Sequence, residues 1–298
     1  RYIALSHCWG TSQHVTTNRE TYEDRTVGIP WSSLPKTFQD AIAITRALGI
    51  QYIWIDSLAI IQGDLEDWAR EASKMASIFQ NCFLALGATD SAGGERGMLF
   101  SPKIHKISKT INERAFQVFV RVASNHEEVD FGLDNHPLLS RGWTFQEQLL
   151  APRFVHFTRD SLVWECNDGL HCECCGRMLD DSSTFRDHFA TMQLTLHKPG
   201  GLASPWEILR SEQPMVSNLW CNLVERYSLR KLSYDWDRLP AISSLASMFT
   251  SHLGKYLAGH WESDLPFSLL WEPRAHSGRR SRPSERPVSS PPSWSWAS

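Results

Sequence analysis

Polar and aromatic residues follow three short apolar segments within the first ninety residues of the chain. In chain order they are Ser6, His7, Trp9 and Gly10 after residues 2–6, Asp56 and Ser57 after residues 52–55, and Thr89 and Asp90 after residues 83–88. The carboxyl ends of parallel strands meet at one edge of an open α/β sheet, which is where such sheets bind ligands. The pattern is therefore consistent with a ligand site at this edge. The alternative is that Asp56 and Ser6 only cap helices or bind loop amides.

A second group of candidate residues lies in the segment Arg141-Gly142-Trp143-Thr144-Phe145-Gln146-Glu147. In a helix that begins at Trp143, the side chains of Trp143, Gln146 and Glu147 share one face because their spacing is i, i+3 and i+4. Glu147 would then project into the site at the sheet edge. A buried ion pair between Arg141 and Glu147 that holds the helix is the structural alternative, and the spacing favours neither.

A cluster of thiols forms the third candidate site. Its members are Cys166, His171, Cys172, Cys174 and Cys175. Structural zinc sites favour Cys-x2–4-Cys pairs, whereas the spacing here is Cys-x5-Cys-x-Cys-Cys. No metal site is predicted, and a zinc-stabilised scaffold is the alternative. A nucleophilic Cys8 beside His7 is disfavoured because neighbours in a strand point to opposite faces.

Hydrophobic periodicity predicts the elements that would position these residues. Predicted helices cover residues 33–49 and 64–82 and the regions around 218–229 and 240–257, and predicted strands cover residues 2–6, 52–55, 83–88 and 116–122. The strand at 52–55 reads as buried, and the one at 116–122 as lying nearer an edge. Residues 141–150 read as a loop entering a helix, and residues 154–157 and 162–166 as a pair of strands. Alternating strands and helices with short connections imply a parallel sheet with right-handed crossovers.

The predicted fold class is α/β, a parallel sheet flanked by helices over residues 1–165. A mostly helical, Trp-rich extension over residues 166–272 follows, and then a segment over residues 273–298 that is rich in Pro, Ser and Arg. Composition predicts a flexible linker over residues 273–293. Trp294 and Trp296 come after it, and because exposed indoles in a tail are costly, we expect them either to dock back on a core or to continue into further sequence.

Composition excludes several classes of protein. The chain has 298 residues and a net charge of -3, which argues against a strongly basic surface that binds duplex nucleic acid. It has no apolar run long enough to span a membrane. It also lacks a Gly-x-Gly-x-x-Gly fingerprint, a Walker loop, a His-Glu-x-x-His motif and a Gly-x-Ser-x-Gly motif.

Seven cysteines, an odd number, and the absence of a glycosylation sequon favour a reducing compartment, so a cytoplasmic location is predicted.

Four ordered motifs resemble the fungal heterokaryon incompatibility (HET) domain. They are Ala4-Leu5-Ser6-His7-Cys8-Trp9-Gly10, Leu34-Pro35-Lys36-Thr37-Phe38-Gln39-Asp40-Ala41-Ile42, Tyr52-Ile53-Trp54-Ile55-Asp56-Ser57-Leu58 and Arg141–Glu147. Later stretches are similar to the segment that commonly follows that domain, namely residues 238–242, 256–259 and 292–298. One departure is Ala59, which stands where the family usually has cysteine, so cysteine chemistry is not available at that position.

The resemblance implies a role in non-self recognition between fungal strains, in which the domain triggers programmed cell death. The HET domain is in turn thought to be distantly similar to TIR domains, which have a flavodoxin-like sheet and some of which cleave NAD with a glutamate. The spacing from Trp143 to Glu147 is similar to that of the TIR segment, which makes Glu147 the candidate catalytic carboxylate. Arg141 would face a phosphate, and Trp143 would contact substrate.

The same resemblance implies substrate contacts at the first two strand ends. The residues concerned are Ser6, His7, Trp9, Gly10, Asp56 and Ser57. NAD would be a substrate, and no resident cofactor is predicted. The alternative function is a non-enzymatic signalling module that acts by self-association or by recruiting death or recognition proteins. Neither a nucleic-acid partner nor a membrane span is predicted.

Overall fold

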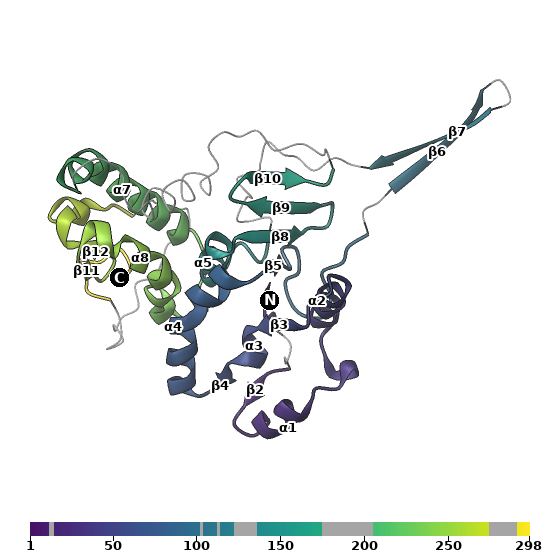
Figure 1. The fold of residues 1–298 in the computed structure, drawn as a ribbon, viewed down its shortest axis with the longest axis horizontal. Helices are drawn as coiled ribbons and strands as arrows, with labels where there is room; N and C mark the ends of the chain where they lie inside the picture. The colour runs from purple at the N-terminus through teal and green to yellow at the C-terminus, as the bar shows by residue number, and fades with distance from the viewer. Residues whose placement is uncertain (12–14, 102–103, 112–113, 122–135, 175–204, 274–290) are drawn as a thin grey trace. The chain divides into compact units, whose positions relative to one another are not determined.

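The computed structural model describes the chain except for residues 12–14, 102–103, 112–113, 122–135, 175–204 and 274–290. The described residues form two compact units, whose elements are labelled in Figure 1. Unit 1 comprises residues 1–140 and 147–188, and unit 2 comprises residues 141–146 and 189–298. Most of the linker predicted at residues 273–293 lies outside the described residues.

Unit 1 is built on a six-stranded mixed sheet. In spatial order its strands are β10 (Gly169–Cys172), β9 (Leu162–Cys166), β8 (Arg153–Phe157), β5 (Leu84–Gly87), β1 (Tyr2–Ser6) and β3 (Tyr52–Ile55). Strands β8, β5, β1 and β3 run parallel to one another. Strand β9 pairs antiparallel with both β8 and β10. The predicted parallel strands are confirmed, and so is the strand pair at residues 154–157 and 162–166. The sheet is mixed rather than wholly parallel, since β9 returns along β8 through a short turn.

Helices cover both faces of this sheet. Those described in unit 1 are α1 (Tyr22–Val27), α2 (Lys36–Ala47), α3 (Asp56–Ala59), α4 (Leu65–Asn81) and the end of α5 (Gly142–Leu150), with a 3₁₀ turn at Trp31–Ser33. Phe38 of α2 packs in one core cluster with Ile3 and Ile55. Phe79 of α4 instead packs against Trp54, with 5.7 Å between the centroids of the two rings. Neighbouring residues of a strand point to opposite faces, so α2 and α4 lie on opposite sides of the sheet.

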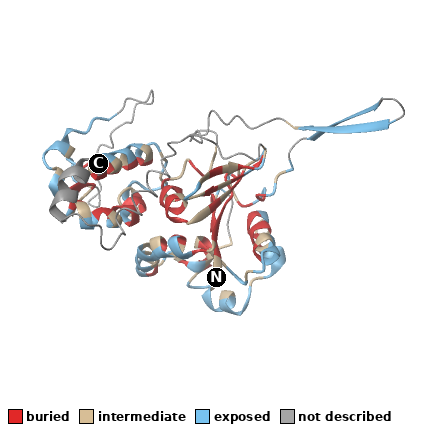
Figure 2. Cartoon of the chain, turned by 45° about the horizontal axis from the view of Figure 1, so that its top comes forward, coloured by how far each residue is buried: buried red, intermediate tan, exposed pale blue. Residues whose placement is uncertain are grey.

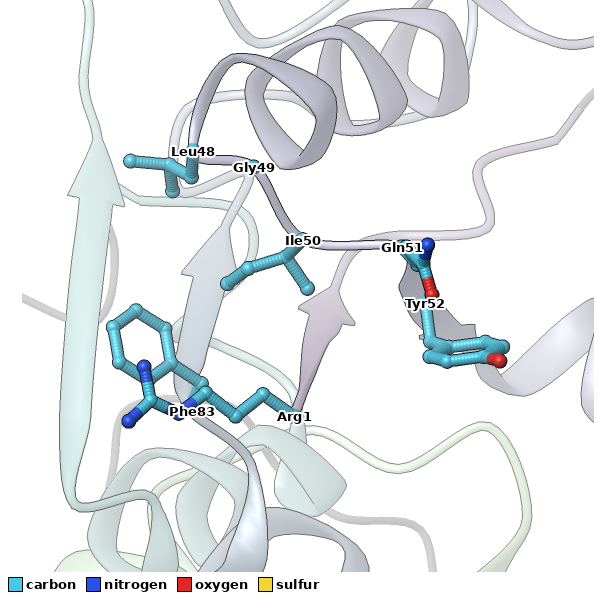
Figure 3. A pocket seen from close by; sticks show the side chains of 7 residues that line it. All are labelled: Arg1, Leu48, Gly49, Ile50, Gln51, Tyr52 and Phe83. Atoms are coloured by element: carbon cyan, nitrogen blue, oxygen red, sulfur yellow. The ribbon is translucent and has the colours of Figure 1, made fainter.

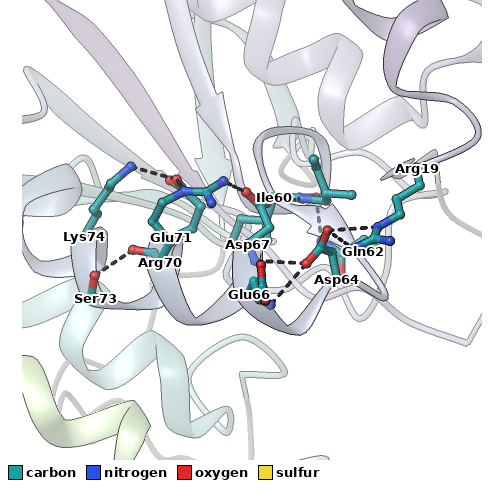
Figure 4. Close-up of polar contacts among 11 residues, drawn as sticks. Arg19, Ile60, Gln62, Asp64, Glu66, Asp67, Arg70, Glu71, Ser73 and Lys74 are labelled. Carbon is teal, nitrogen blue, oxygen red and sulfur yellow. Dashed lines mark hydrogen bonds and ion pairs between the residues drawn. The ribbon is translucent and has the colours of Figure 1, made fainter.

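Polar contacts explain where α4 begins (Figure 4). The side chain of Asp64 accepts hydrogen bonds from the backbone N–H groups of Glu66 and Asp67, both at 3.1 Å. Such an N-cap contributes about 1 kcal/mol. The buried carboxylate of Asp67 accepts a hydrogen bond from the N–H of Ile61 at 2.7 Å. This bond holds β4 (Ile61–Gln62), which pairs in parallel with β2 (Thr17–Asn18).

A hairpin forms a second, separate sheet in unit 1. Strands β6 (Ile104–Ile111) and β7 (Arg114–Arg121) pair with each other in antiparallel register. The expectation that residues 116–122 lie near an edge of the main sheet is therefore wrong. Apolar and polar residues alternate along β7, but this alternation does not reflect burial, because the strand is exposed (Figure 2). The side chain of Phe119, for example, is 64% exposed. The prediction of a buried strand at residues 52–55 is also wrong in part, since β3 ends the main sheet and Tyr52 is 67% exposed.

Unit 2 has an aromatic core. Its elements are the start of α5, α7 (Pro205–Ser228), α8 (Pro240–Leu253), the hairpin of β11 (Tyr256–Leu257) and β12 (His260–Trp261), and 3₁₀ turns at Asp235–Asp237, Glu262–Asp264 and Phe267–Leu270. The rings of Trp220, Phe249 and Trp261 meet at centroid distances of 5.4 to 6.3 Å. The helix predicted over residues 240–257 ends at Leu253, because Gly254 takes a φ of 77° that breaks the helical repeat.

The last residues of the chain dock on this core, as the sequence predicts. The indole N–H of Trp296 donates to the carbonyl oxygen of Gly259 at 2.8 Å, and that of Trp220 donates to the same oxygen at 3.1 Å. The hydroxyl of the buried Ser295 donates to the carbonyl oxygen of Ala258 at 2.6 Å. These bonds satisfy the indole donors that make a buried tryptophan costly.

Substitution of Gly259 tests this docking. Gly259 has a φ of 104°, and an added Cβ would lie 2.4 Å from Nε1 of Trp296. Gly254 has a φ of 77° with nothing within 4 Å of its added Cβ, so Gly254→Ala reports backbone strain alone. We expect Gly259→Ala to lower the free energy of unfolding by about 1–3 kcal/mol more than Gly254→Ala, measured by urea titration with tryptophan fluorescence. Equal losses would contradict the docking of Trp296.

Candidate functional site

The end of the interior strand β1, which lies between β5 and β3, carries a buried hydroxyl–carboxylate pair. The hydroxyl of Ser6 donates a hydrogen bond to Oε2 of Glu147, which α5 supplies. Ser6 is 1% exposed and Glu147 is 5% exposed. Residues 141–150, for which the sequence predicts a loop entering a helix, form the helix α5 from Gly142 onward, and α5 brings the predicted carboxylate to the first strand end.

Asp56 organises a second polar cluster, at the end of β3. Its Oδ2 accepts a hydrogen bond from the indole N–H of Trp9 at 2.9 Å, and its Oδ1 accepts one from the backbone N–H of Ser57 at 2.6 Å. Oδ1 also lies 3.7 Å from Nδ1 of His7, whose ring packs edge-on against Phe38 at 5.0 Å. Asp56 is 20% exposed, so this cluster is closer to solvent than Glu147. Asp56 therefore bonds an amide of its own helix α3, as the structural alternative expects, and also joins residues from two strand ends.

The loop that follows β1 and the loop that follows β5 pack closely against each other. Gly10 has a φ of 75°, and a Cβ added to it would lie 2.9 Å from the Cα of Gly93. The hydroxyl of Thr37 in α2 donates to the carbonyl oxygen of Gly94 at 3.0 Å, and the N–H of Thr37 donates to the same oxygen at 2.9 Å. The loop after β5 is thus held between the loop after β1 and the start of α2.

The buried carboxylate of Asp40 secures the same loop further along. Its Oδ2 accepts hydrogen bonds from the backbone N–H groups of Met98 at 3.0 Å and Leu99 at 3.4 Å, and its Oδ1 pairs with the ammonium of Lys36. Asp40 and Thr37 both belong to the motif at residues 34–42, so that motif has a positioning role in this fold.

A buried network that sequence reasoning missed lies beside the Ser6–Glu147 pair. His156 of β8 is fully buried, with Nδ1 3.1 Å from the hydroxyl of Thr89 and Nε2 2.9 Å from Oε2 of Glu165 in β9. The side-chain amide of Gln148 in α5 donates to the same Oε2 at 2.9 Å. The network ties α5 to the sheet at the residue after Glu147. His156 and Glu165 are polar residues inside the apolar strands β8 and β9, and this pattern in the sequence could have predicted the network.

Asp90, the other residue singled out after β5, also has partners within unit 1. Its Oδ1 lies 2.5 Å from Nδ1 of His136, and its Oδ2 accepts a hydrogen bond from the backbone N–H of Arg159 at 2.6 Å. Asp90 therefore holds two loops together at the carboxyl edge of the sheet.

Arg141 and Trp143 make their described contacts within unit 2. The indole N–H of Trp143 donates to Oδ2 of Asp237 at 3.1 Å, and Arg141 forms a β-bridge with Lys231. Burial raises the pKa of the Asp237 carboxyl, and the hydrogen bond from Trp143 partly opposes that shift. The contacts of Arg141 and Trp143 with substrate stay predictions.

Two other features of the described part of the chain lie apart from these polar clusters. No group of three or more His, Cys, Asp or Glu side chains among the described residues could hold a metal ion, and Cys175 of the predicted thiol cluster lies outside them. An open pocket of about 310 Å³ is lined by Arg1, Leu48, Gly49, Ile50, Gln51, Tyr52 and Phe83 (Figure 3). It lies at the amino ends of the strands, opposite the polar clusters, and contains no carboxylate.

Among the residues that the structure describes, no helix is long and apolar enough to cross a membrane.

These features define an α/β domain with a buried hydroxyl–carboxylate pair and a polar cluster around Asp56 at the carboxyl ends of adjacent parallel strands. Residues 2–147 match the family model described as "Heterokaryon incompatibility protein (HET)", so the chain carries a HET domain over these residues and has a role related to heterokaryon incompatibility. No curated protein and no solved structure matches the chain. The four motifs of the resemblance lie at β1, the start of α2, β3 and α5, the elements that hold the polar clusters.

Substitution of Asp40 tests how the loop after β5 is held. Asp40→Ala leaves the N–H groups of Met98 and Leu99 without their acceptor, and an unsatisfied buried donor costs about 1–3 kcal/mol. We therefore expect Asp40→Ala to lower the free energy of unfolding by about 2–4 kcal/mol in a urea titration. The control Glu66→Ala removes an exposed carboxylate and should change it by less than about 0.5 kcal/mol. A loss no larger than the control's would show that Asp40 does not secure the loop.

Proposed function

We propose that this HET-domain protein is an effector of non-self recognition and programmed cell death in fungi, and that it acts by cleaving NAD at the ribosyl–nicotinamide bond. Glu147 is the proposed catalytic carboxylate. The observation that carries the proposal is the hydrogen bond from the Ser6 hydroxyl to Glu147, at the end of the parallel strand β1.

The chemistry of the bond fits a single buried carboxylate. Water replaces nicotinamide on the ribosyl carbon, so that NAD and water give ADP-ribose, nicotinamide and a proton. Cleavage passes through an oxocarbenium-like state, whose positive charge a nearby carboxylate stabilises. Such stabilisation is stronger where water is excluded, and Glu147 is almost fully buried. A ribose hydroxyl can donate to Glu147 in the same way as the Ser6 hydroxyl does.

The cluster around Asp56 would supply binding contacts in this mechanism. Trp9 is partly exposed, and its indole N–H is held by Asp56, so the ring is positioned to pack against a planar base. The imidazole of His7 and the backbone at Gly10 complete the proposed substrate contacts from β1. Arg141 is proposed to bind a phosphate of the substrate.

Removal of the charge on Glu147 tests the enzymatic mechanism. Glu147→Gln keeps the size of the side chain and still offers an oxygen to Ser6, but it cannot stabilise a cation. We expect it to reduce nicotinamide release from NAD at least about 100-fold, as loss of one transition-state contact of this kind does. Release is measured on the purified chain at high concentration.

Glu66→Gln is the matched control, because it removes one exposed carboxylate from the same unit. It should release nicotinamide at the rate of the unchanged chain. A Glu147→Gln protein that melts at the same temperature and still turns over NAD would end the catalytic assignment.

The β6–β7 hairpin favours a second candidate function, a signalling module that works by self-association or partner recruitment. Ile107, Phe116, Val118 and Val120 share one face of the hairpin and are 44% to 58% exposed. An isolated hairpin is marginally stable in water, and exposed strand edges readily pair with another chain.

Charged substitutions on this face separate the two functions. Val118→Lys should abolish concentration-dependent assembly in light scattering if assembly runs through the hairpin, whereas Gln117→Lys on the opposite face should not. If the module is non-enzymatic, cell killing is lost with Val118→Lys and kept with Glu147→Gln. The reverse pattern would exclude assembly through this face as the cause of killing.

A further inference from the structure

Two thiols meet at the end of β10, outside the polar clusters described above. Sγ of Cys172 lies 2.9 Å from Sγ of Cys174, and a single residue, Glu173, separates them in the chain. The backbone N–H of Cys174 points to Sγ of Cys172 at 3.4 Å, and the thiol of Cys172 donates to the hydroxyl of Ser161, also at 3.4 Å. The sulfur atoms are therefore brought together by the turn that follows β10.

The surroundings of the two thiols differ. Cys172 is 2% exposed and packs with Val163 and Leu170, whereas Cys174 is partly exposed at the margin of this cluster. Cys166 does not share the face, because Cys172 lies opposite Val163 in the β9–β10 register and residues 163 and 166 point to opposite sides of β9. Among the described cysteines the pair thus has one accessible member and one sheltered member.

We propose that Cys172 and Cys174 are a reversible oxidation site, which forms an intramolecular disulfide by exchange with a small disulfide such as glutathione disulfide. The thiolate of Cys174, the accessible member, attacks one sulfur of glutathione disulfide and releases one glutathione thiolate. Cys172 loses its proton and attacks the mixed disulfide at Sγ of Cys174, which releases the second glutathione. Two protein thiols are oxidised to one disulfide, and one glutathione disulfide is reduced to two glutathiones.

The contacts of Glu173 connect this bond to the rest of unit 1. Its backbone N–H donates to the carbonyl oxygen of Leu162 at 3.0 Å, and its carboxylate accepts from the N–H of Leu162 at 3.0 Å and lies 3.5 Å from the guanidinium of Arg121. A disulfide across Glu173 closes a small ring around the residue that contacts both β9 and β7. Small-ring disulfides are strained and easily reduced, so the bond suits a site that responds to the redox state of its compartment.

Thiol mapping tests the proposal. The full chain is incubated with glutathione disulfide, remaining thiols are alkylated, and peptides are assigned by mass spectrometry. We expect a Cys172–Cys174 bond that dithiothreitol reverses. With Cys172→Ser, a mixed disulfide with glutathione should accumulate at Cys174, because the resolving thiol is gone. With Cys174→Ser, oxidation at Cys172 should fall at least about tenfold, because Cys172 is sheltered.

Cys221→Ser is the control, since it removes an exposed thiol of unit 2 and should leave the Cys172–Cys174 bond unchanged. If Cys172→Ser does not fold, the peptide map of the unchanged chain and the Cys174→Ser result still decide. A bond from either thiol to Cys175 or Cys166, the absence of any bond in glutathione disulfide, or stoichiometric zinc that blocks alkylation of the pair would each overturn the proposal. These outcomes do not depend on turnover of NAD.

Discussion

The hydrogen bond between Ser6 and Glu147 joins the interior strand β1 of the sheet to a helix that is distant in the chain. It places a buried carboxylate where β1 ends, and a buried carboxylate is costly unless it is hydrogen-bonded. The surrounding structure holds that geometry. The network of His156, Glu165 and Gln148 fixes α5 against the sheet, so a change in the network would move the carboxylate as well.

The loops at the carboxyl edge depend on one another in the same way. Gly10 lies so close to Gly93 that the loop after β1 has no room for a side chain at residue 10, and Asp40 and Thr37 anchor the loop after β5 from α2. This arrangement explains why the motif at residues 34–42, which has no catalytic side chain in our proposal, accompanies the motifs at the strand ends. Its residues position the site rather than take part in it.

Two features of the chain lie outside the polar clusters, namely the aromatic core of unit 2 and the pair of thiols at Cys172 and Cys174. The aromatic residues of unit 2 form a core that the final residues complete, with Trp296 and Trp220 sharing the carbonyl oxygen of Gly259. The thiol of Cys172 lies at the end of β10, an edge strand of the main sheet, and that of Cys174 lies in the turn that follows it. The docking contacts lie in residues 256–259 and 292–298, which resemble the segment that commonly follows the HET domain, whereas the two thiols lie outside the family motifs.

The sequence alone determined the elements with strong local periodicity. Strands at residues 2–6, 52–55 and 83–88 and the two helices between them were predictable because their apolar spacing is a local property. The polar residues after each strand could be placed at one edge by the topology of parallel sheets. Only the tertiary structure decided their partners, since Ser6 and Glu147 are 141 residues apart in the chain and periodicity carries no information on such pairs. It also decided that residues 114–121 form a separate hairpin, because alternation in a strand looks the same whether its apolar face is buried or exposed.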